Sequence, residues 1–107
     1  MLADVAEGER VLGCTVESVQ SVVKPRRDDI TRCYRAALGR NANAGGRLEV
    51  EMHIDKTGTA KFLGVQGDTF RDEEFTRCVF AVLRPLPFPI PDKEPCVLVY
   101  PFVLSAG

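Results

Sequence analysis

Four cysteines and a single histidine are the residues of this chain that could do chemistry. Cys14, Cys33, Cys78 and Cys96 include no CxxC pair, and His53 falls on the polar face of a predicted strand. A zinc site would therefore need four distant segments to converge, so we expect no metal and no cofactor. Two alternatives remain from the residues alone: two disulfides in an oxidising compartment, or four buried thiols in the cytosol. The even count in a small domain favours disulfides.

Acidic residues do not form a convincing catalytic group. Asp68, Asp72, Glu73 and Glu74 lie close together, but acids at this place are explained by capping and by the dipole of a helix that begins there. The chain has no nucleophile elbow, phosphate loop or Cys-His pair at motif spacing. We therefore expect that the protein is not an enzyme.

Length and charge narrow the class of protein further. The 107 residues suit one domain, and 14 Lys and Arg against 15 Asp and Glu give a net charge of -1, which does not favour nucleic-acid binding. No stretch is long and apolar enough to span a membrane, and the N-terminus lacks the features of a signal peptide. If the domain is exported, we expect a segment absent from this sequence to anchor or export it.

The strongest structural signal is the alternation of apolar and polar residues from Gly46 to Ile54, which predicts a strand with one buried face. A turn at residues 55–58 and a second apolar run over 60–65 complete a predicted β-hairpin. Gly64 is the predicted site of a bulge, because the second run does not alternate cleanly.

Apolar residues at helical spacing predict one helix from about Glu17 to Gly39 and a second one capped by Asp72 and ended by Pro85. Pro25 interrupts the first helix, which either kinks there or restarts at that residue. In residues 86–91, apolar residues alternate with proline, so we expect this segment to be extended. Its apolar side chains should pack under the second helix. The last strand should run from Cys96 to Leu104, with Pro101 confining it near an edge or taking its second half out of the ladder.

These elements predict an α+β domain with a three-stranded antiparallel sheet, in the order second, first, third strand, and two helices packed on one face. Residues 1–16 are expected as a lead-in with a possible short strand, and residues 17–107 as the domain itself. The last strand is apolar and forms one edge of the predicted sheet. Such an edge can pair with a strand of another chain.

Six motifs follow one another between about residues 17 and 104: Cys33-Tyr34, Gly46-Arg47, Ile54 with Gly58, Cys78-Val79, Phe88-Pro89-Ile90-Pro91 and Tyr100-Pro101-Phe102. In this order they resemble the AgmX/PglI C-terminal domain family. This family, found mainly in myxobacterial envelope and gliding-motility proteins, is similar to the C-terminal domain of TonB, the energy transducer. The resemblance implies a periplasmic location, a parent protein anchored in the inner membrane, and an outer-membrane or periplasmic protein partner bound by strand addition.

The same resemblance implies a disulfide between Cys33 and Cys78, which occupy the two cysteine positions of the family. Cys14 and Cys96 depart from its pattern, and our hypothesis is a second bridge that ties the N-terminal segment to the last strand. Such a bridge would cover part of the edge needed for strand addition. Pro25 is a further departure, which leaves the length of the first helix open.

We expect the last strand to bind the partner mainly through its backbone, with outward side chains at Val97 or Val99 setting the register. Tyr100 and Phe102 match aromatic positions of the family and are further candidate contacts, although such residues more often belong to a core. The alternatives are a homodimer formed through the same edge and a small cytosolic adaptor with reduced thiols. Six basic residues around the first helix are expected to form a solvated face: Lys24, Arg26, Arg27, Arg32, Arg35 and Arg40.

Overall fold

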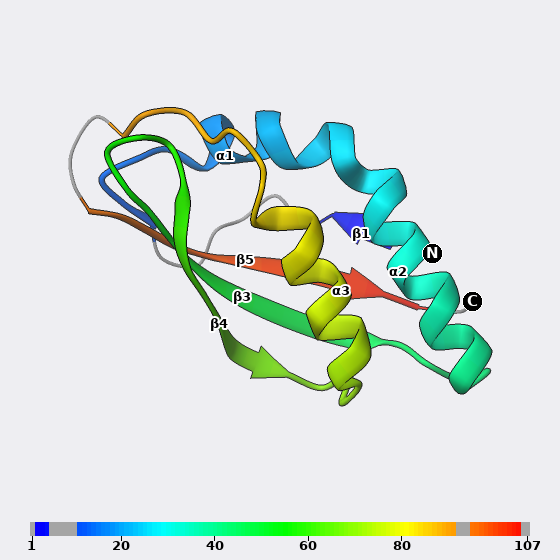
Figure 1. Cartoon of the computed structure of the whole chain (residues 1–107). Helices are drawn as coiled ribbons and strands as arrows, with labels where there is room; N and C mark the ends of the chain where they lie inside the picture. Colours follow the sequence, from blue (N-terminus) through cyan, green and yellow to red (C-terminus); the bar gives the residue numbers. More distant parts are fainter. Residues whose placement is uncertain (1, 5–10, 92–94, 106–107) are drawn as a thin grey trace.

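One antiparallel sheet with helices on a single face makes up the domain, as the computed structural model shows for residues 2–4, 11–91 and 95–105 (Figure 1). The strand order is β1-β5-β3-β4, and β2 also pairs with β5. The three long strands, β4, β3 and β5, have the predicted order, so the predicted α+β class and three-stranded core are confirmed. The two short strands, β1 (Leu2–Asp4) and β2 (Val11–Leu12), extend this core beyond β5.

The central strand β3 (Gly46–Ile54) has the predicted alternation of buried and half-buried side chains. Leu48, Val50 and Met52 are fully buried beneath the helices. Each of these side chains contributes roughly 1.5 to 3 kcal/mol when removed from water, so the register of β3 is strongly specified. β3 pairs along its whole length with β5 (Cys96–Leu104), whose predicted bounds are also confirmed.

The neighbouring strand β4 (Ala60–Asp68) is longer than predicted and contains two irregularities. Ile54 pairs with Ala60 while His53 pairs with Phe62, and a second shift lies between Gly67 and Val65, so the extra residues are 61 and 66. The predicted bulge at Gly64 is therefore wrong. The first bulge is needed because Ala60 and Leu63, three residues apart, are both buried on the helix side.

The first predicted helix consists of α1 (Val16–Val23), a 3₁₀ turn over Lys24–Arg26, and α2 (Arg27–Arg40). Thr15 caps α1 by accepting a hydrogen bond from the Ser18 amide at 3.1 Å. Pro25 lies in the 3₁₀ turn because it has no N–H to donate to the preceding turn of an α-helix. The helical path is thus interrupted at Pro25, and α2 begins two residues after it.

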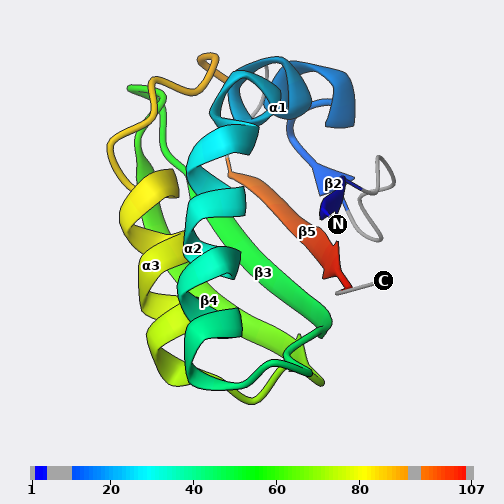
Figure 2. The same ribbon diagram turned by 90° about the vertical axis from the view of Figure 1, so that its right-hand side faces the viewer.

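The second predicted helix is α3 (Glu73–Leu83), and Asp72 caps it as predicted, accepting from the Phe75 amide at 3.1 Å. Arg40, at the end of α2, pairs with Asp72 at 2.8 Å and with Glu74 at 3.1 Å, which joins the two helices at this end. Partial burial acts to raise the pKa of Asp72, but the hydrogen bonds from Arg40 and Phe75 outweigh it and hold that pKa below its usual value. Figure 2 shows α2 and α3 side by side over the sheet.

The segment between α3 and β5 is anchored by its own apolar side chains and by one turn of the hairpin. Leu86 and Phe88 are buried as predicted, but Ile90 is 71% exposed, so the prediction that it packs under α3 is wrong. The Phe88 amide donates to the Gly58 carbonyl at 2.9 Å. Gly58 itself has a φ of +82°, and a Cβ atom there would overlap the carbonyl oxygen of Phe88.

This close approach predicts that Gly58→Ala destabilises the domain by about 2 kcal/mol or more, because it adds backbone strain and forces the anchored segment away. Gly39→Ala is the matched control, since Gly39 lies in α2 with open space around its Cα, and it should stabilise by roughly 0.5 to 1 kcal/mol. Urea unfolding of the oxidised proteins measures both changes. Equal stabilities of the two variants would contradict the anchoring role of this turn.

Candidate functional site: the outer edge of β5

Along β5, the backbone N–H and C=O groups of successive residues point alternately towards β3 and towards the outer edge of the sheet. A hydrogen bond of Arg47 in β3 shows which residues point in which direction. The Arg47 carbonyl accepts from the Thr69 amide at 2.9 Å, so Arg47 faces β4. Because the direction of the backbone N–H and C=O groups alternates along a strand, the even-numbered residues of β3 direct these groups towards β5. These pair with even-numbered residues of β5, so the odd-numbered residues of β5 direct their N–H and C=O groups to its outer edge.

Pro101 fits this alternation. It pairs with Glu49, which faces β4, so the ring nitrogen of Pro101 points to the outer edge and no hydrogen bond to β3 is lost. The prediction that proline places this strand near an edge agrees with that orientation. The alternative, a second half that leaves the ladder, is wrong, because pairing with β3 continues to Leu104.

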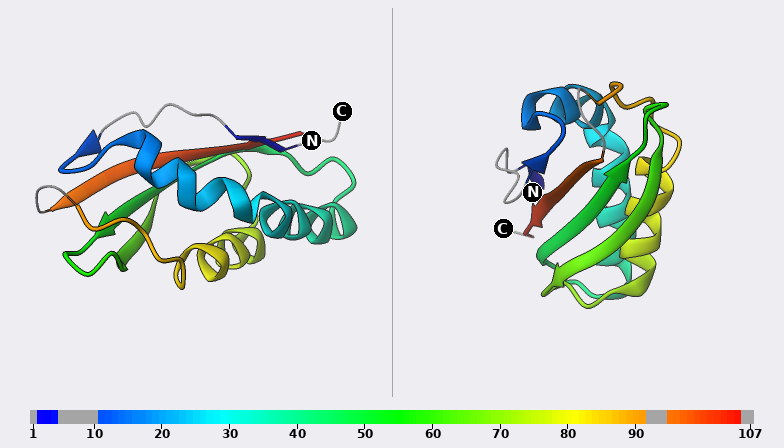
Figure 3. Two further views of the ribbon diagram at one scale, coloured as in Figure 1. Left: turned by 90° about the horizontal axis from the view of Figure 1, so that it is seen from above. Right: turned by 90° about the vertical axis from the view of Figure 1, so that its left-hand side faces the viewer.

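The outer edge of β5 is occupied by two short strands of the same chain, β1 and β2 (Figure 3, left). We call these two strands the N-terminal segment. β1 pairs antiparallel with residues 102–104, and β2 pairs antiparallel with residues 97 and 98. The prediction that β5 forms a free edge of the sheet is therefore wrong for these positions. β1 has three residues and β2 has two, which is too few to show alternation. No pattern therefore predicts β1, and only a short strand near Val11 is suggested by the sequence.

A disulfide fixes the junction of this segment with β5. Cys14 and Cys96 are bonded, with a Cα–Cα distance of 5.3 Å, two residues after the end of β2 and at the first residue of β5. The second bridge joins Cys33 of α2 to Cys78 of α3 with a Cα–Cα distance of 5.7 Å. Both predicted pairings are present. Two disulfides in a small domain indicate an oxidising, extracytoplasmic environment.

The four predicted partner contacts lie on two faces of β5. Tyr100 and Phe102 point into the core, each 1% exposed, with their rings 5.1 Å apart. Their side chains are not available to a partner here, which corrects that prediction: even-numbered residues of β5 share the helix-covered face with Leu48 and Val50. Val97 is half-buried on the opposite face, whereas Val99 on that face is only 3% exposed, so the side chain of Val99 is not available to a partner here either.

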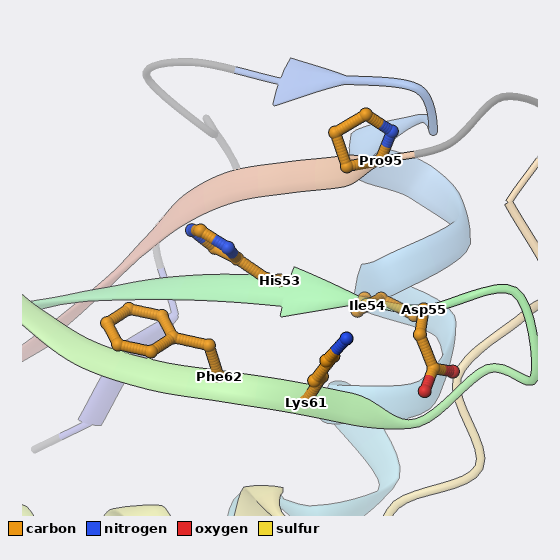
Figure 4. Close-up of a pocket in the computed structure, with 6 residues that line it drawn as sticks. All are labelled: His53, Ile54, Asp55, Lys61, Phe62 and Pro95. Atoms are coloured by element: carbon orange, nitrogen blue, oxygen red, sulfur yellow. The ribbon is translucent and has the colours of Figure 1, made fainter.

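A cleft of about 470 Å³ opens on the sheet near the start of β5 (Figure 4). His53 from β3 lies 4.7 Å from the ring of Phe62, and its Nε2 is 2.6 Å from a carboxylate oxygen of Glu51. Phe62 is 47% exposed. The pKa of Asp55, at the other end of the cleft, lies below its usual value because the Thr57 hydroxyl and the amides of Thr59 and Thr57 donate to its carboxylate. The lining is His53, Ile54, Asp55, Lys61, Phe62 and Pro95.

The cleft and the basic residues near the start of α2 offer charged and polar side chains. Within the described residues, no group of His, Cys, Asp and Glu is placed to hold a metal ion. In the same part of the chain no helix has the length and apolar character needed to cross a bilayer. Arg26 and Arg32 both pair with Asp29, as expected for a solvated helical face.

The opposite edge of the sheet is β4, which pairs with no other strand among the described residues. Its two bulges leave residues 62–65 as the longest run in regular register with β3, and the charged Lys61 lies at the first bulge. Bulges and charges are features by which edge strands resist pairing with other chains. The long, regular edge is that of β5.

Searches of protein-family models, curated proteins and solved structures found no match to this chain. The resemblance to the AgmX/PglI C-terminal domain family stays a prediction.

The position of the Cys14–Cys96 bridge predicts that it controls one end of the β5 edge. In the double variant C14A/C96A, amide exchange at Val97 should rise at least tenfold relative to that at Val50, because β2 loses its covalent attachment. The matched control C33A/C78A should lower the free energy of unfolding by about 3 to 4 kcal/mol without this selective effect at Val97. Native-state hydrogen exchange by NMR measures both, and equal exchange ratios in the two variants would contradict the assignment.

Proposed function

We propose that this domain is a non-enzymatic protein-interaction module of the periplasm that docks a partner by adding a strand at the outer edge of β5. The observation that carries this proposal is the pairing of β5 with β1 and β2. Two separate segments of the same chain already bind this edge as antiparallel strands. The edge therefore has the spacing and the backbone directions that an added strand requires.

The difference between the two sheet edges supports the choice of β5. A partner on β4 would meet two bulges within nine residues, whereas β5 pairs with β3 from Cys96 to Leu104 without a register shift. A partner strand gains affinity from successive main-chain hydrogen bonds, each contributing roughly 0.5 to 1.5 kcal/mol net. An uninterrupted edge allows more of these bonds in one register.

The disulfides and the family resemblance together support the cellular setting. Bridges of this kind persist in the periplasm, and the resemblance to TonB-like domains suggests an envelope-spanning system for energy transduction or gliding motility. The parent protein would then be anchored in the inner membrane by a segment absent here, and its partner would be an outer-membrane or periplasmic protein. A cytosolic adaptor with reduced thiols is disfavoured by the two bridges.

A homodimer is the second candidate, and a specific feature of the edge favours it. β1 is only three residues long and pairs with a strand from the far end of the sequence. Exchange of β1 between two copies would recreate the same pairing in a dimer without new contacts. Mass measured over a range of protein concentrations separates this candidate from docking of a different protein.

The docking proposal is tested with extended peptides selected from a displayed library against the oxidised 107-residue chain. We expect the selected peptides to shift backbone amide signals of Val99 and Val103 in NMR titrations. Proline placed at successive positions of a bound peptide should abolish binding at every second position, because only alternate residues donate to β5. Peptides that shift only α2 and α3 signals, or that tolerate proline equally at every position, would contradict strand addition at β5.

A further inference from the structure

We infer that β1 is a built-in, displaceable occupant of the docking edge, which a partner strand must replace at residues 102–104. This inference rests on the proposed docking at β5 and adds a mechanism that controls it. Both β1 and an added strand would use the same outward groups of Val103, since β1 pairs Ala3 with that residue. The two cannot occupy the edge at the same time.

The hydrogen bonds available to β1 are few. Odd-numbered residues of β5 face outward, so among the three pairs of β1 only Ala3 with Val103 is a hydrogen-bonded pair. Such a pair exchanges two backbone hydrogen bonds. A partner strand that pairs with Val103 and with further outward groups of β5 would make more bonds than β1, which gives it the advantage needed for replacement.

The two ends of the N-terminal segment are held very differently. β2 is followed after one residue by Cys14, whose disulfide to Cys96 holds it next to its partners on β5. No described disulfide holds β1, which lies at the other end of β5 (Figure 3, left). An incoming strand would therefore displace β1 and leave β2 in place, so the exchangeable part of the edge is residues 102–104.

The register of β1 also specifies what can replace it. Leu2 lies opposite Leu104 and Asp4 opposite Phe102, so the built-in strand runs antiparallel to β5. We infer an antiparallel partner strand in this register, with its residue opposite Val103 both donating and accepting. Opposite Pro101 the partner can only donate, because proline offers a carbonyl and no N–H.

An occupied edge also has a protective effect. An apolar strand with unpaired backbone groups is a template for uncontrolled association with other chains. β1 covers the end of β5 until a partner with more hydrogen bonds is present. Edge protection and selection for longer strands thus follow from one contact.

The test uses the oxidised 107-residue chain with Ala3→Pro, which removes the backbone N–H that points to β5. Asp4→Pro is the matched control, because the Asp4 amide faces away from β5 in this register. We expect amide exchange at Val103 to be at least tenfold faster in A3P than in the wild type. In D4P the exchange rate at Val103 should be close to that of the wild type. The exchange rate at Val97 should be the same in all three proteins. The probe is a synthetic peptide with the sequence of residues 1–6, MLADVA.

In titrations followed by NMR, this peptide should shift the Val103 signal of A3P and restore slow exchange there, with at least a tenfold weaker response in the wild type. Equal Val103 exchange in A3P and the wild type, or equal peptide binding to both, would overturn the inference. One further result would contradict the docking proposal while supporting the displacement of β1. If A3P opens and accepts MLADVA but no library peptide binds β5 in either protein, β1 is displaceable and strand docking of a partner is wrong.

Discussion

The disulfide between Cys14 and Cys96 is the constraint on which the state of the β5 edge depends. It attaches the N-terminal segment to the first residue of β5, so that β2 can pair with residues 97 and 98 at little further entropic cost. Without a covalent attachment, a two-residue strand would not repay the ordering of its own backbone. At one end of the β5 edge, residues 97 and 98 pair with β2, which the disulfide holds in place. At the other end, residues 102–104 pair with β1, which has only three residues.

A rigid core supports that edge. β5 lies between β3 and the N-terminal strands, and its even-numbered side chains pack with Leu48, Val50 and Met52 under α2 and α3. The Cys33–Cys78 bridge and the Arg40–Asp72 pair hold the two helices together over this layer. Changes at the outer edge can therefore occur while β5 itself keeps its position, because its inner side is fully paired.

The sequence predicts the parts of the fold that repeat a local pattern. Nine alternating residues of β3, the Asp72 cap and the apolar run of β5 each contain enough residues to show their period or their terminus. The uneven alternation of the second apolar run predicts a bulge at Gly64, yet the position of the first bulge depends on which side chains must reach the core. Ala60 and Leu63 both do, so the extra residue lies between them. That requirement comes from tertiary packing, so it cannot be recognised in the local sequence pattern.

The candidate site was predicted in part. The bounds of β5 follow from the sequence, the Cys33–Cys78 bridge follows from the family resemblance, and the Cys14–Cys96 bridge was a separate hypothesis that the structure bears out. Of the two predictions for Pro101, the position near an edge agrees with the structure, whereas the predicted contacts Tyr100 and Phe102 belong to the core. The pairing of β1 with β5 could not be predicted, because it joins residues 2–4 to residues 102–104 through a contact that exists only after the sheet has formed.

The most direct test of this account is disulfide mapping by mass spectrometry, on protein exported to an oxidising compartment and alkylated without reductant. The account predicts two linked peptide pairs, Cys14 with Cys96 and Cys33 with Cys78, and no alkylated cysteine. Alkylated thiols at Cys14 and Cys96, or any exchanged pairing, would contradict it, because the N-terminal segment would then have no covalent hold on the β5 edge.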